Sequence, residues 1–302
     1  MFITINNRNI VNFIAKKRWL RRLKIFKQPA LSYVEWHDKK IYVDTSDWNG
    51  PSFHVLKWGM ESYEKDNFEI LRMICNQDTT FLDIGANIGI FSIKLAHLNK
   101  EMEIHAFEPE PITNQCLEKS VKQNDFKNIA VHKVALSNKN GQSSFYFDAT
   151  NHGGHSLNAE SIEGEGNLIS HEINVELETL DQFVLKNMIN KIDLIKMDVQ
   201  RHEANVLEGG LQTLKKNRPI ILMECYLDDL NVADSYLHKA LRELNDYCIY
   251  EPKNNKVIDV LEYSENSFPK YNNNHKVQYY DFLFIPKEKK DEILKKINER
   301  FI

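Results

Sequence analysis

The sequence predicts an α/β fold in which a mostly parallel, seven-stranded sheet carries helices on both faces. Three observations lead to this prediction. A short apolar run at 79–82 is followed by a glycine turn and then by helical spacing, the order of a strand, a tight turn and a helix. Further apolar runs at 104–107, 192–197 and 219–223 each end at an acidic residue and are separated by stretches with helical periodicity. With 302 residues, 42% of them hydrophobic, the chain can form one large domain of this kind plus an arm.

The first strand and its turn form the clearest candidate for a binding site. The strand Thr79–Leu82 closes at Asp83, Gly85 and Gly89 frame the turn, and helical spacing starts at Ile90. This order leaves free backbone N–H groups at a helix N-terminus, where a ligand can meet them. Glycine has no Cβ, so we expect the two glycines to let the backbone approach that ligand closely.

The residues of this turn favour a cationic ligand over a dinucleotide. A dinucleotide fingerprint requires glycine where this sequence has Asn87 and Ile90. An acid at the strand end suits S-adenosyl-L-methionine, which carries a sulfonium and an ammonium group and no phosphate. The acid at the end of the next apolar run is expected to take the ribose hydroxyls. A structural turn with an incidental acid is the alternative. The predicted cofactor-binding residues are Asp83, Gly85, Asn87, Gly89, Glu108 and Asp198.

Three segments of the chain resemble the FkbM family of S-adenosylmethionine-dependent methyltransferases. They are Asp83–Gly89, Ala106–Pro109 and Ile195–Val199 with the following His202-Glu203, and the likeness spans roughly residues 60 to 285. The resemblance implies a Rossmann-like class I methyltransferase fold and a saccharide hydroxyl as the acceptor. The family commonly shows Asp-Val-Glu-Gly where this chain continues from Val199 with Gln200-Arg201. That departure bears on acceptor recognition and leaves the cofactor motif untouched.

The catalytic residues are expected just after the fourth core strand. Asp198, His202 and Glu203 follow this strand, and in an open α/β sheet ligands bind at the carboxyl ends of the strands. A hydroxyl acceptor benefits from a general base, and a carboxylate or an imidazole can serve as one. A helix cap for Asp198 and an exposed helix start for His202 are the alternatives. If neither His202 nor Glu203 is needed, the next candidates are His152 and His155 in a loop rich in Gly, His and Ser.

No metal site is assigned from the sequence. The alternative is a Mg²⁺ ion held by Asp198 and Glu224 at neighbouring strand ends, for which no third ligand is spaced to match. The four cysteines show neither disulfide density nor metal spacing and are expected to be buried thiols in a reducing compartment.

The chain is expected to begin with a basic amphipathic arm, residues 1–30. Residues 1–12 are polar and expected to be mobile, and residues 17–27 have helical spacing. Residues 1–27 hold eight basic residues and no acid, so a total net charge of −4 leaves −12 on the remainder. This helix, within residues 16–27, can lie on an anionic membrane surface or pack against its own domain, and both interpretations stay open. No apolar run is long enough to span a membrane, and no signal-peptide core is seen, so we expect a cytoplasmic protein, with peripheral contact to the inner face of the membrane as the second interpretation.

The rest of the chain divides into a cap at 31–75 with a hairpin around Asp38-Lys39, a cofactor-binding domain at 76–286 and a C-terminal surface helix at 287–302. Within the domain, 128–136 is expected to be the third core strand, and the strictly alternating 143–147 and 173–177 to be antiparallel additions. Helices are expected at 112–123, 180–190 and 205–214, and the last two strands at 248–250 and 277–285.

These observations predict an O-methyltransferase that acts on a hydroxyl of a saccharide or glycoconjugate. The sugar comes from the resemblance, whereas the residues themselves indicate the cofactor site. A cofactor-binding module without catalysis and a methyltransferase acting on another small molecule are the alternatives, and a nicotinamide oxidoreductase is disfavoured by the missing glycines. Nucleic acid is not expected as substrate, because the body of the chain is acidic and no Asn/Asp-Pro-Pro-aromatic turn follows the fourth strand.

Overall fold

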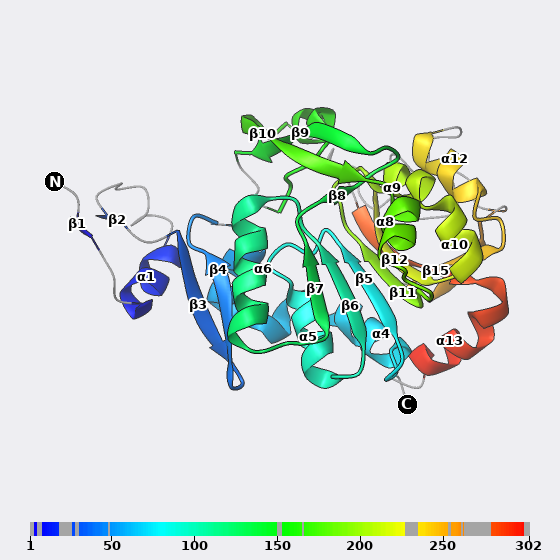
Figure 1. The fold of residues 1–302 in the computed structure, drawn as a ribbon, viewed down its shortest axis with the longest axis horizontal. Helices are drawn as coiled ribbons and strands as arrows, with labels where there is room; N and C mark the ends of the chain where they lie inside the picture. The colour runs from blue at the N-terminus through cyan, green and yellow to red at the C-terminus, as the bar shows by residue number, and fades with distance from the viewer. Residues whose placement is uncertain are drawn as a thin grey trace.

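The computed structural model describes residues 3–4, 8–17, 26–27, 30–47, 49–149, 153–164, 166–226, 235–252, 255–260, 262 and 279–298. Its centre is a sheet of eight strands, in the order β14-β13-β15-β12-β11-β5-β6-β7 (Figure 1). The strands are β5 (Thr80–Ile84), β6 (Glu103–Phe107), β7 (Ile129–His132), β11 (Leu194–Met197), β12 (Ile220–Tyr226), β13 (Tyr247–Glu251), β14 (Lys256–Asp259) and β15 (Tyr279–Pro286).

Five neighbouring strands of this sheet are parallel. β5 lies in the middle, paired on one side with β6, which pairs with β7, and on the other with β11, which pairs with β12. β15 enters antiparallel between β12 and β13, and β14 forms a hairpin with β13. The predicted mostly parallel sheet is therefore present with one strand more than the seven expected, because β14 extends the edge. Chain order changes direction at β5, which in such sheets opens a crevice at the carboxyl ends of the strands.

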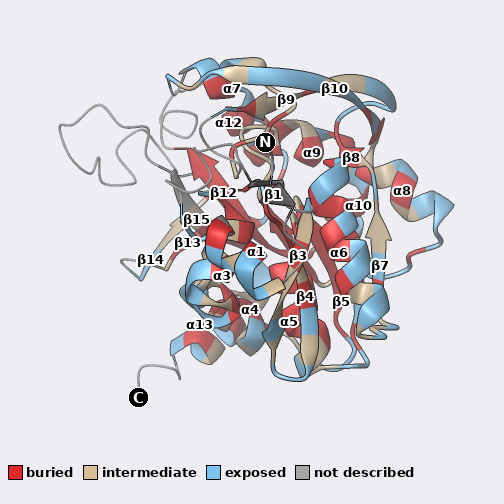
Figure 2. Ribbon diagram, turned by 90° about the vertical axis from the view of Figure 1, so that its left-hand side faces the viewer, coloured by how far each residue is buried: buried red, intermediate tan, exposed pale blue. Residues whose placement is uncertain are grey.

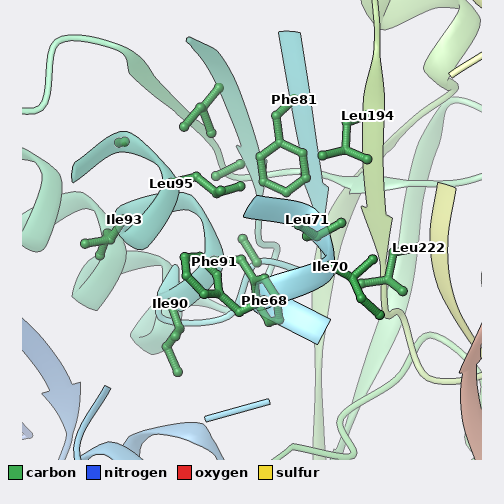
Figure 3. Close-up of a cluster of buried hydrophobic side chains, with 14 of the residues drawn as sticks. Phe68, Ile70, Leu71, Phe81, Ile90, Phe91, Ile93, Leu95, Leu194 and Leu222 are labelled. Carbon is green, nitrogen blue, oxygen red and sulfur yellow. The ribbon is translucent and has the colours of Figure 1, made fainter. Parts of the chain in front are cut away.

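Helices cover both faces, as predicted. α4 (Lys65–Ile74), α5 (Ile90–Leu98), α6 (Pro111–Gln123) and α13 (Lys290–Asn298) contribute to a buried cluster with Phe81 and Leu194. Figure 3 shows the part of this cluster that lies between α4, α5 and the strands. α8 (Leu180–Lys186), α9 (Glu203–Gly209), α10 (Leu211–Asn217) and α12 (Tyr236–Arg242) contribute to a second cluster with Leu82 and Ile195. Successive strand residues thus point to opposite faces, and both faces are covered. This explains why the central strands β5 and β11 are buried along their whole length (Figure 2) and mostly apolar, with Asp83 and Lys196 as their charged residues.

The N-terminal region packs beside α6. The predicted hairpin is formed by β3 (Leu31–Trp36) and β4 (Lys39–Asp44), and Tyr42 N donates to Ser120 Oγ of α6 at 2.8 Å. Helix α3 (Pro51–Trp58) and a 3-10 turn, η1 (Met60–Ser62), lead into α4. Helix α3 is not among the helices expected from the sequence. Proline at the first helical position starts this helix, since it needs no N–H donor there.

Where the structure describes the N-terminal arm, the structure differs from the prediction. Helix α1 (Arg8–Ala15) occupies part of the stretch expected to be mobile, with Val11 and Ile14 buried. The predicted helix at 17–27 lies largely outside the described residues, but its last two residues form strand β2 (Phe26–Lys27), paired with β1 (Ile3–Thr4). Among the described residues no helix is long and apolar enough to cross a membrane.

A second, three-stranded sheet corrects two predictions. The run at 128–136 is not one strand. β7 ends at His132, and β8 (Ala135–Leu136) pairs with β10 (Ile169–Glu178), which pairs antiparallel with β9 (Gly141–Asp148). β9 and β10 therefore do not extend the central sheet. They lie across the top of the molecule in Figure 1, with the short helix α7 (Ala159–Gly164) between them in sequence. An apolar run does not indicate which sheet it joins, so its pattern could not show the break.

The remaining helices are close to prediction. α8 ends at Lys186, earlier than expected, and the helix predicted at 205–214 is divided into α9 and α10 at Gly210, a residue that weakens helices. A 3-10 turn, η2 (Lys287–Lys289), precedes α13 in the C-terminal segment.

Candidate active site

A cavity of about 340 Å³ lies at the carboxyl ends of β5, β6, β11 and β12. Its floor includes Gly85, Glu108 and Asp198, which follow three of these strands. Other walls come from the start of α3, with His54, and from the connection between β9 and β10, with His155. The cavity is therefore at the crevice expected from the change in strand order, closed over by segments outside the parallel core.

The turn after β5 is held by the end of β6. Gly85 N and Ala86 N donate to Phe107 O at 3.1 and 2.9 Å, and Asn87 N donates to Glu108 Oε2 at 2.8 Å. Asn87 has φ of +52°, a left-handed conformation that Asn tolerates well. All of these residues line the cavity.

The two glycines of this turn are required for a different reason than the sequence indicated. Gly85 has φ of +80°, and a Cβ there would stand 1.9 Å from the backbone oxygen of Asp198. Gly89 also has φ of +80°, and its Cβ would stand 2.2 Å from Leu117 Cδ1. Both clashes are with the protein itself. Gly85 lets the turn approach the end of β11, and Gly89 lets α5 pack against α6.

Asp83 is buried beneath the turn and does not line the cavity. Its Oδ2 accepts hydrogen bonds from Ser92 N at 3.2 Å and from Ser92 Oγ at 2.6 Å, which fixes the start of α5. Its Oδ1 has no hydrogen-bond partner in the structure, and burial raises the pKa of Asp83. Asp83 is therefore not among the residues that a ligand in the cavity would touch directly. It can act through the turn that it supports.

Glu108 has the geometry of a hydroxyl-binding carboxylate. Its two oxygens accept Asn87 N and Glu110 N, each at 2.8 Å, so the carboxylate is held in one orientation. Burial raises its pKa to about 7. A carboxylate offers about four lone-pair sites, so these two bonds leave capacity for hydroxyl donors such as a ribose diol.

The opposite end of the cavity is a cluster of polar side chains around Asp198. Lys196 Nζ donates to Asp198 Oδ2 at 3.0 Å, and Gln200 Nε2 donates to Asp198 Oδ1 at 2.7 Å and to Glu224 Oε2 at 3.0 Å. Tyr226 OH donates to Gln200 Oε1 at 3.1 Å and thereby orients the amide. Burial lowers the pKa of Lys196, but nearby carboxylates, Asp198 foremost, outweigh this effect and leave its pKa above the ordinary value.

Gln200 and Arg201, the departure from the family pattern, both have left-handed backbones, with φ of +54° and +68°. Ser156 Oγ donates to Gln200 O at 2.7 Å, which joins this turn to the β9–β10 connection. The guanidinium carbon of Arg201 lies 3.9 Å from the ring centroid of Tyr226. The bulk of Arg201 is thus stacked on an aromatic ring, a favourable contact for a guanidinium.

Two further carboxylates complete the cluster and were missed by sequence reasoning. Asp281 of β15 lies opposite Glu224 of β12 in the antiparallel register, and Glu64 precedes α4 with φ of +40°. Asn67 Nδ2 donates to Asp281 Oδ2 at 2.7 Å and to Glu64 Oε2 at 3.2 Å. Burial raises the pKa of Glu64 to about 7 and also raises the pKa values of Glu224 and Asp281. An acid inside an apolar strand was the available signal for Asp281.

The three predicted catalytic residues are not equivalent. Asp198 and His202 line the cavity, whereas Glu203 is buried outside it and accepts Val199 N at 3.0 Å, so it braces the turn. His202 Nε2 lies 3.0 Å from Ser137 Oγ, and burial lowers the pKa of His202 to about 4. This imidazole is neutral at physiological pH and a weak base. Of the reserve candidates, His155 lines the cavity and His152 lies outside the described residues.

The magnesium alternative meets a specific obstacle. The amide nitrogen of Gln200, a donor, occupies the position between Asp198 and Glu224 where the cation would have to lie. Across the described ranges, no group of three or more His, Cys, Asp or Glu side chains is arranged to hold a metal ion.

The sheet order, with its change of direction at β5 and the cavity at that point, defines a Rossmann-like class I methyltransferase fold. A family model described as the methyltransferase FkbM domain matches residues 83–252, more than half of the chain. The chain therefore belongs to the FkbM methyltransferase family.

Two relatives that are named methyltransferases match part of the chain. The chain is 28% identical over 162 residues to 2-O-methyltransferase NoeI of Sinorhizobium fredii, covering 50% of this chain and 65% of that protein. It is 24% identical over 146 residues to Methyltransferase 1 of Beauveria bassiana, covering 44% of this chain and 58% of that protein. The chain thus spans less than two thirds of the length of these curated relatives. A crystal structure of methyltransferase FkbM from Methylobacillus flagellatus KT has a TM-score of 0.41 and 14% identity, covering 76% of this chain and 51% of that chain.

Proposed function

We propose that this protein is an S-adenosyl-L-methionine-dependent O-methyltransferase whose acceptor is a hydroxyl group of a saccharide or glycoconjugate. The observation that carries the proposal is one cavity with two different ends. One end has the oriented carboxylate of Glu108, and the other has Asp198 among further carboxylates. Membership of a methyltransferase family and the name of the 2-O-methyltransferase relative support the reaction.

The residues of the cavity suit this cofactor in charge and in hydrogen-bonding capacity. Glu108 would accept the ribose hydroxyls, and the backbone from Gly85 to Asn87 would line the space beside them. Glu64, Asp198, Glu224 and Asp281 would surround the cationic portion, with Lys196 as a partial counter-charge. The cofactor, when bound, supplies a methyl group already activated on a positive sulfur. The protein's remaining tasks are to orient the acceptor and to take its proton.

We place the proton-accepting group within the carboxylate cluster, with Glu64 as the leading member. Glu64 lines the cavity and has a pKa of about 7, which suits a general base at physiological pH. Asp198, tied to Lys196 and Gln200, would orient the cofactor and the acceptor. His202 has its pKa lowered to about 4, and Glu203 is directed to the backbone of Val199, so both are weaker candidates.

The test combines ligand binding with turnover. Calorimetry with S-adenosylhomocysteine and a methyl-transfer assay on neutral saccharides should both give positive results for the wild type. Glu108→Ala should lose cofactor affinity. Glu64→Gln should keep that affinity within a few-fold while turnover falls by ~10²–10⁴, the usual contribution of a general base. Glu118→Gln, on the exposed side of α6, is the matched control and should change neither quantity. Absence of cofactor binding in the wild type would refute the proposal.

A cofactor-binding protein without catalysis is the second candidate, favoured by Gln200 and Arg201, which replace the family's Glu-Gly. It predicts normal S-adenosylhomocysteine affinity and no transfer to any hydroxyl acceptor. Both residues can be replaced, Gln200 by Glu and Arg201 by Gly. Recovery of turnover in this variant would favour the non-catalytic protein over the first proposal.

We also propose a cytoplasmic location, with residues 16–27 contacting the inner face of the membrane and no nucleic-acid substrate. The eight basic residues and the absence of acids in residues 1–27 support the membrane contact, and the net charge of −12 on the remainder disfavours a nucleic-acid substrate. Deletion of residues 1–27 should reduce sedimentation with anionic liposomes at low salt and leave cofactor binding intact. Equal sedimentation of both forms would leave the alternative of an arm packed on its own domain.

A further inference from the structure

A second cavity, of about 520 Å³, adjoins the first. Asn87, Glu110, Thr113 and His155 line both. The segment leading into α3 also belongs to both walls, with Asp47 in the second cavity and Gly50 in the first. The two cavities are therefore neighbours with a common wall. Each volume is in the range of an ordinary small-ligand site, so the cofactor and the acceptor need not share one space.

One wall of the second cavity is a row of three rings. The rings of Phe147 and His171 are stacked, with centroids 4.0 Å apart and an interplanar angle of 19°. The ring centroid of His155 lies 4.6 Å from that of Phe147, and these two rings are tilted relative to each other. All three side chains line the second cavity, and His155 also reaches the first. Phe147 and His171 cover each other's facing surfaces, so the row offers its remaining ring surface to the cavity. That surface can supply apolar contact to the C–H groups of a pyranose without demanding one orientation of its hydroxyls.

The polar wall of this cavity is unsuited to anions. Its charged side chains, among the described residues that line it, are the carboxylates Asp44, Asp47, Glu110 and Asp148, with no lysine or arginine. Helix N-termini can bind phosphate through free N–H groups, but both helix starts here are already capped. Glu110 accepts Ile112 N and Thr113 N at the start of α6, at 3.0 and 2.5 Å. Asp47 accepts Gly50 N and Phe53 N at the start of α3, at 2.6 and 3.1 Å.

The carboxylates that repel anions can still accept hydrogen bonds from hydroxyl groups. Glu110 is held by two backbone donors, one on each oxygen, and a carboxylate has about four acceptor sites. Its orientation is fixed by the helix, so a hydroxyl bond to it costs little further ordering. Sugar recognition uses this combination of apolar ring surface and an oriented hydrogen-bond acceptor.

We propose that the second cavity binds a glycosyl unit of the acceptor that carries no anionic group, next to the unit that receives the methyl group. This inference rests on the proposed function for the identity of the acceptor as a saccharide. It makes the acceptor at least a disaccharide, and it disfavours a sugar phosphate or a nucleoside diphosphate sugar.

The experiment measures binding separately from turnover. Saturation-transfer NMR with S-adenosylhomocysteine present would use cellobiose, maltose, lactose and di-N-acetylchitobiose, each beside its monosaccharide and the monosaccharide 1-phosphate. At least one disaccharide should bind more tightly than its monosaccharide, and the phosphates should bind more weakly. Phe147→Ala should weaken disaccharide binding about five- to tenfold, because it removes the middle ring of the row, and leave S-adenosylhomocysteine affinity unchanged.

Two variants sharpen the result. Tyr146→Ala is the matched control, because Tyr146 neighbours Phe147 on β9, points to the opposite face of the strand and does not line the cavity. It should bind disaccharides as the wild type does. Ile112→Lys adds a cation to the cavity wall, where Ile112 is 37% exposed, and should strengthen binding of the sugar phosphates.

The outcomes separate the two proposals. Disaccharide binding that depends on Phe147, without methylation of any sugar, would support the second cavity and refute the proposed function. Methylation of monosaccharides with equal rates in the wild type and Phe147→Ala, and no gain from a second unit, would refute the second cavity as a subsite and support the proposed function. Failure of all four disaccharides to bind at millimolar concentration would also overturn the inference.

Discussion

Replacing Gln200 by glutamate tests how the carboxylate cluster is kept together. The Gln200 amide donates to Asp198 at 2.7 Å and to Glu224 at 3.0 Å. Gln200→Glu removes both donors and puts a third carboxyl group between two carboxylates, while the size of the side chain is unchanged. The same substitution restores the residue common in the family at this position.

The structure permits an estimate of which effect prevails. At a separation of about 3 Å and an effective dielectric constant of ~20, two carboxylates repel by ~5 kcal/mol. Holding an ordinary glutamic acid protonated at pH 7 costs only about 4 kcal/mol. Repulsion from a single ionised neighbour already exceeds this cost, so the cluster should take up one extra proton, which then bridges the carboxyl groups.

The consequence is a stability that depends on pH. The folded variant retains a proton that the unfolded chain has released, so the free energy of unfolding falls as pH rises above the ordinary pKa of glutamic acid. Relative to the wild type, Gln200→Glu should be nearly as stable at pH 5 and less stable by up to ~4 kcal/mol at pH 8. Gln200→Ala should lose about 3 kcal/mol at both values, because two hydrogen bonds to charged groups disappear without an added charge.

Urea unfolding at the two pH values measures these differences. Gln123→Glu adds the same carboxyl group at an exposed position of α6 and should follow the wild type. If Gln200→Glu shows the same pH dependence as Gln123→Glu, the introduced group is not repelled by the cluster, and the reasoning about its electrostatics is wrong.

Three further predictions concern single residues of the site. Because Glu64 has a pKa of about 7, S-adenosylmethionine binding at pH 7 should release about half a proton from it, as calorimetry in buffers of different ionisation enthalpy would measure. Binding of S-adenosylhomocysteine, which lacks the sulfonium charge, should release a smaller fraction of a proton. An equal release would contradict a contact between Glu64 and the sulfonium. Gly85→Ala should lower the free energy of unfolding, measured in urea, by about 2–4 kcal/mol, because the new Cβ would lie 1.9 Å from Asp198 O. Gly166 has φ of +76° with no atom within 4 Å of a Cβ, so Gly166→Ala should lower it by only about 1 kcal/mol. Burial lowers the pKa of His202 to about 4, so this residue makes the free energy of unfolding fall as pH falls from 6.5 to 4. His202→Gln should therefore lose less stability over this pH range than the wild type. An equal loss in both proteins would mean that the imidazole is exposed to water.

The parts of the site that sequence could predict are those that follow parallel strands. Asn87, Glu108 and Asp198 each come shortly after an apolar run that ends in a polar residue, and parallel strands bring such positions to one edge. The family motif includes the same residues. Their placement around one cavity therefore needs only the order of strands and turns.

The residues that sequence could not place depend on contacts between distant segments. Asp281 reaches the cavity because β15 runs antiparallel to β12 and pairs it with Glu224, and nothing local to residue 281 specifies that register. Glu64 lies in the connection before α4, whose position relative to the sheet is set by packing. The exclusion of Asp83 from the cavity depends on Ser92 and on the path of one turn, which apolar periodicity does not report.

β15 is also important for the order in which the protein can be assembled during synthesis. It lies between β12 and β13 in space but follows both in sequence. As the chain emerges from the ribosome, β12 has an unpaired edge and the β13–β14 hairpin has no place in the sheet until residue 286 has been made. Unpaired edges of apolar strands are templates for aggregation. A chain interrupted between residues 252 and 279 would contain the whole matched family region, yet it would lack the strand that seals the sheet and supplies Asp281.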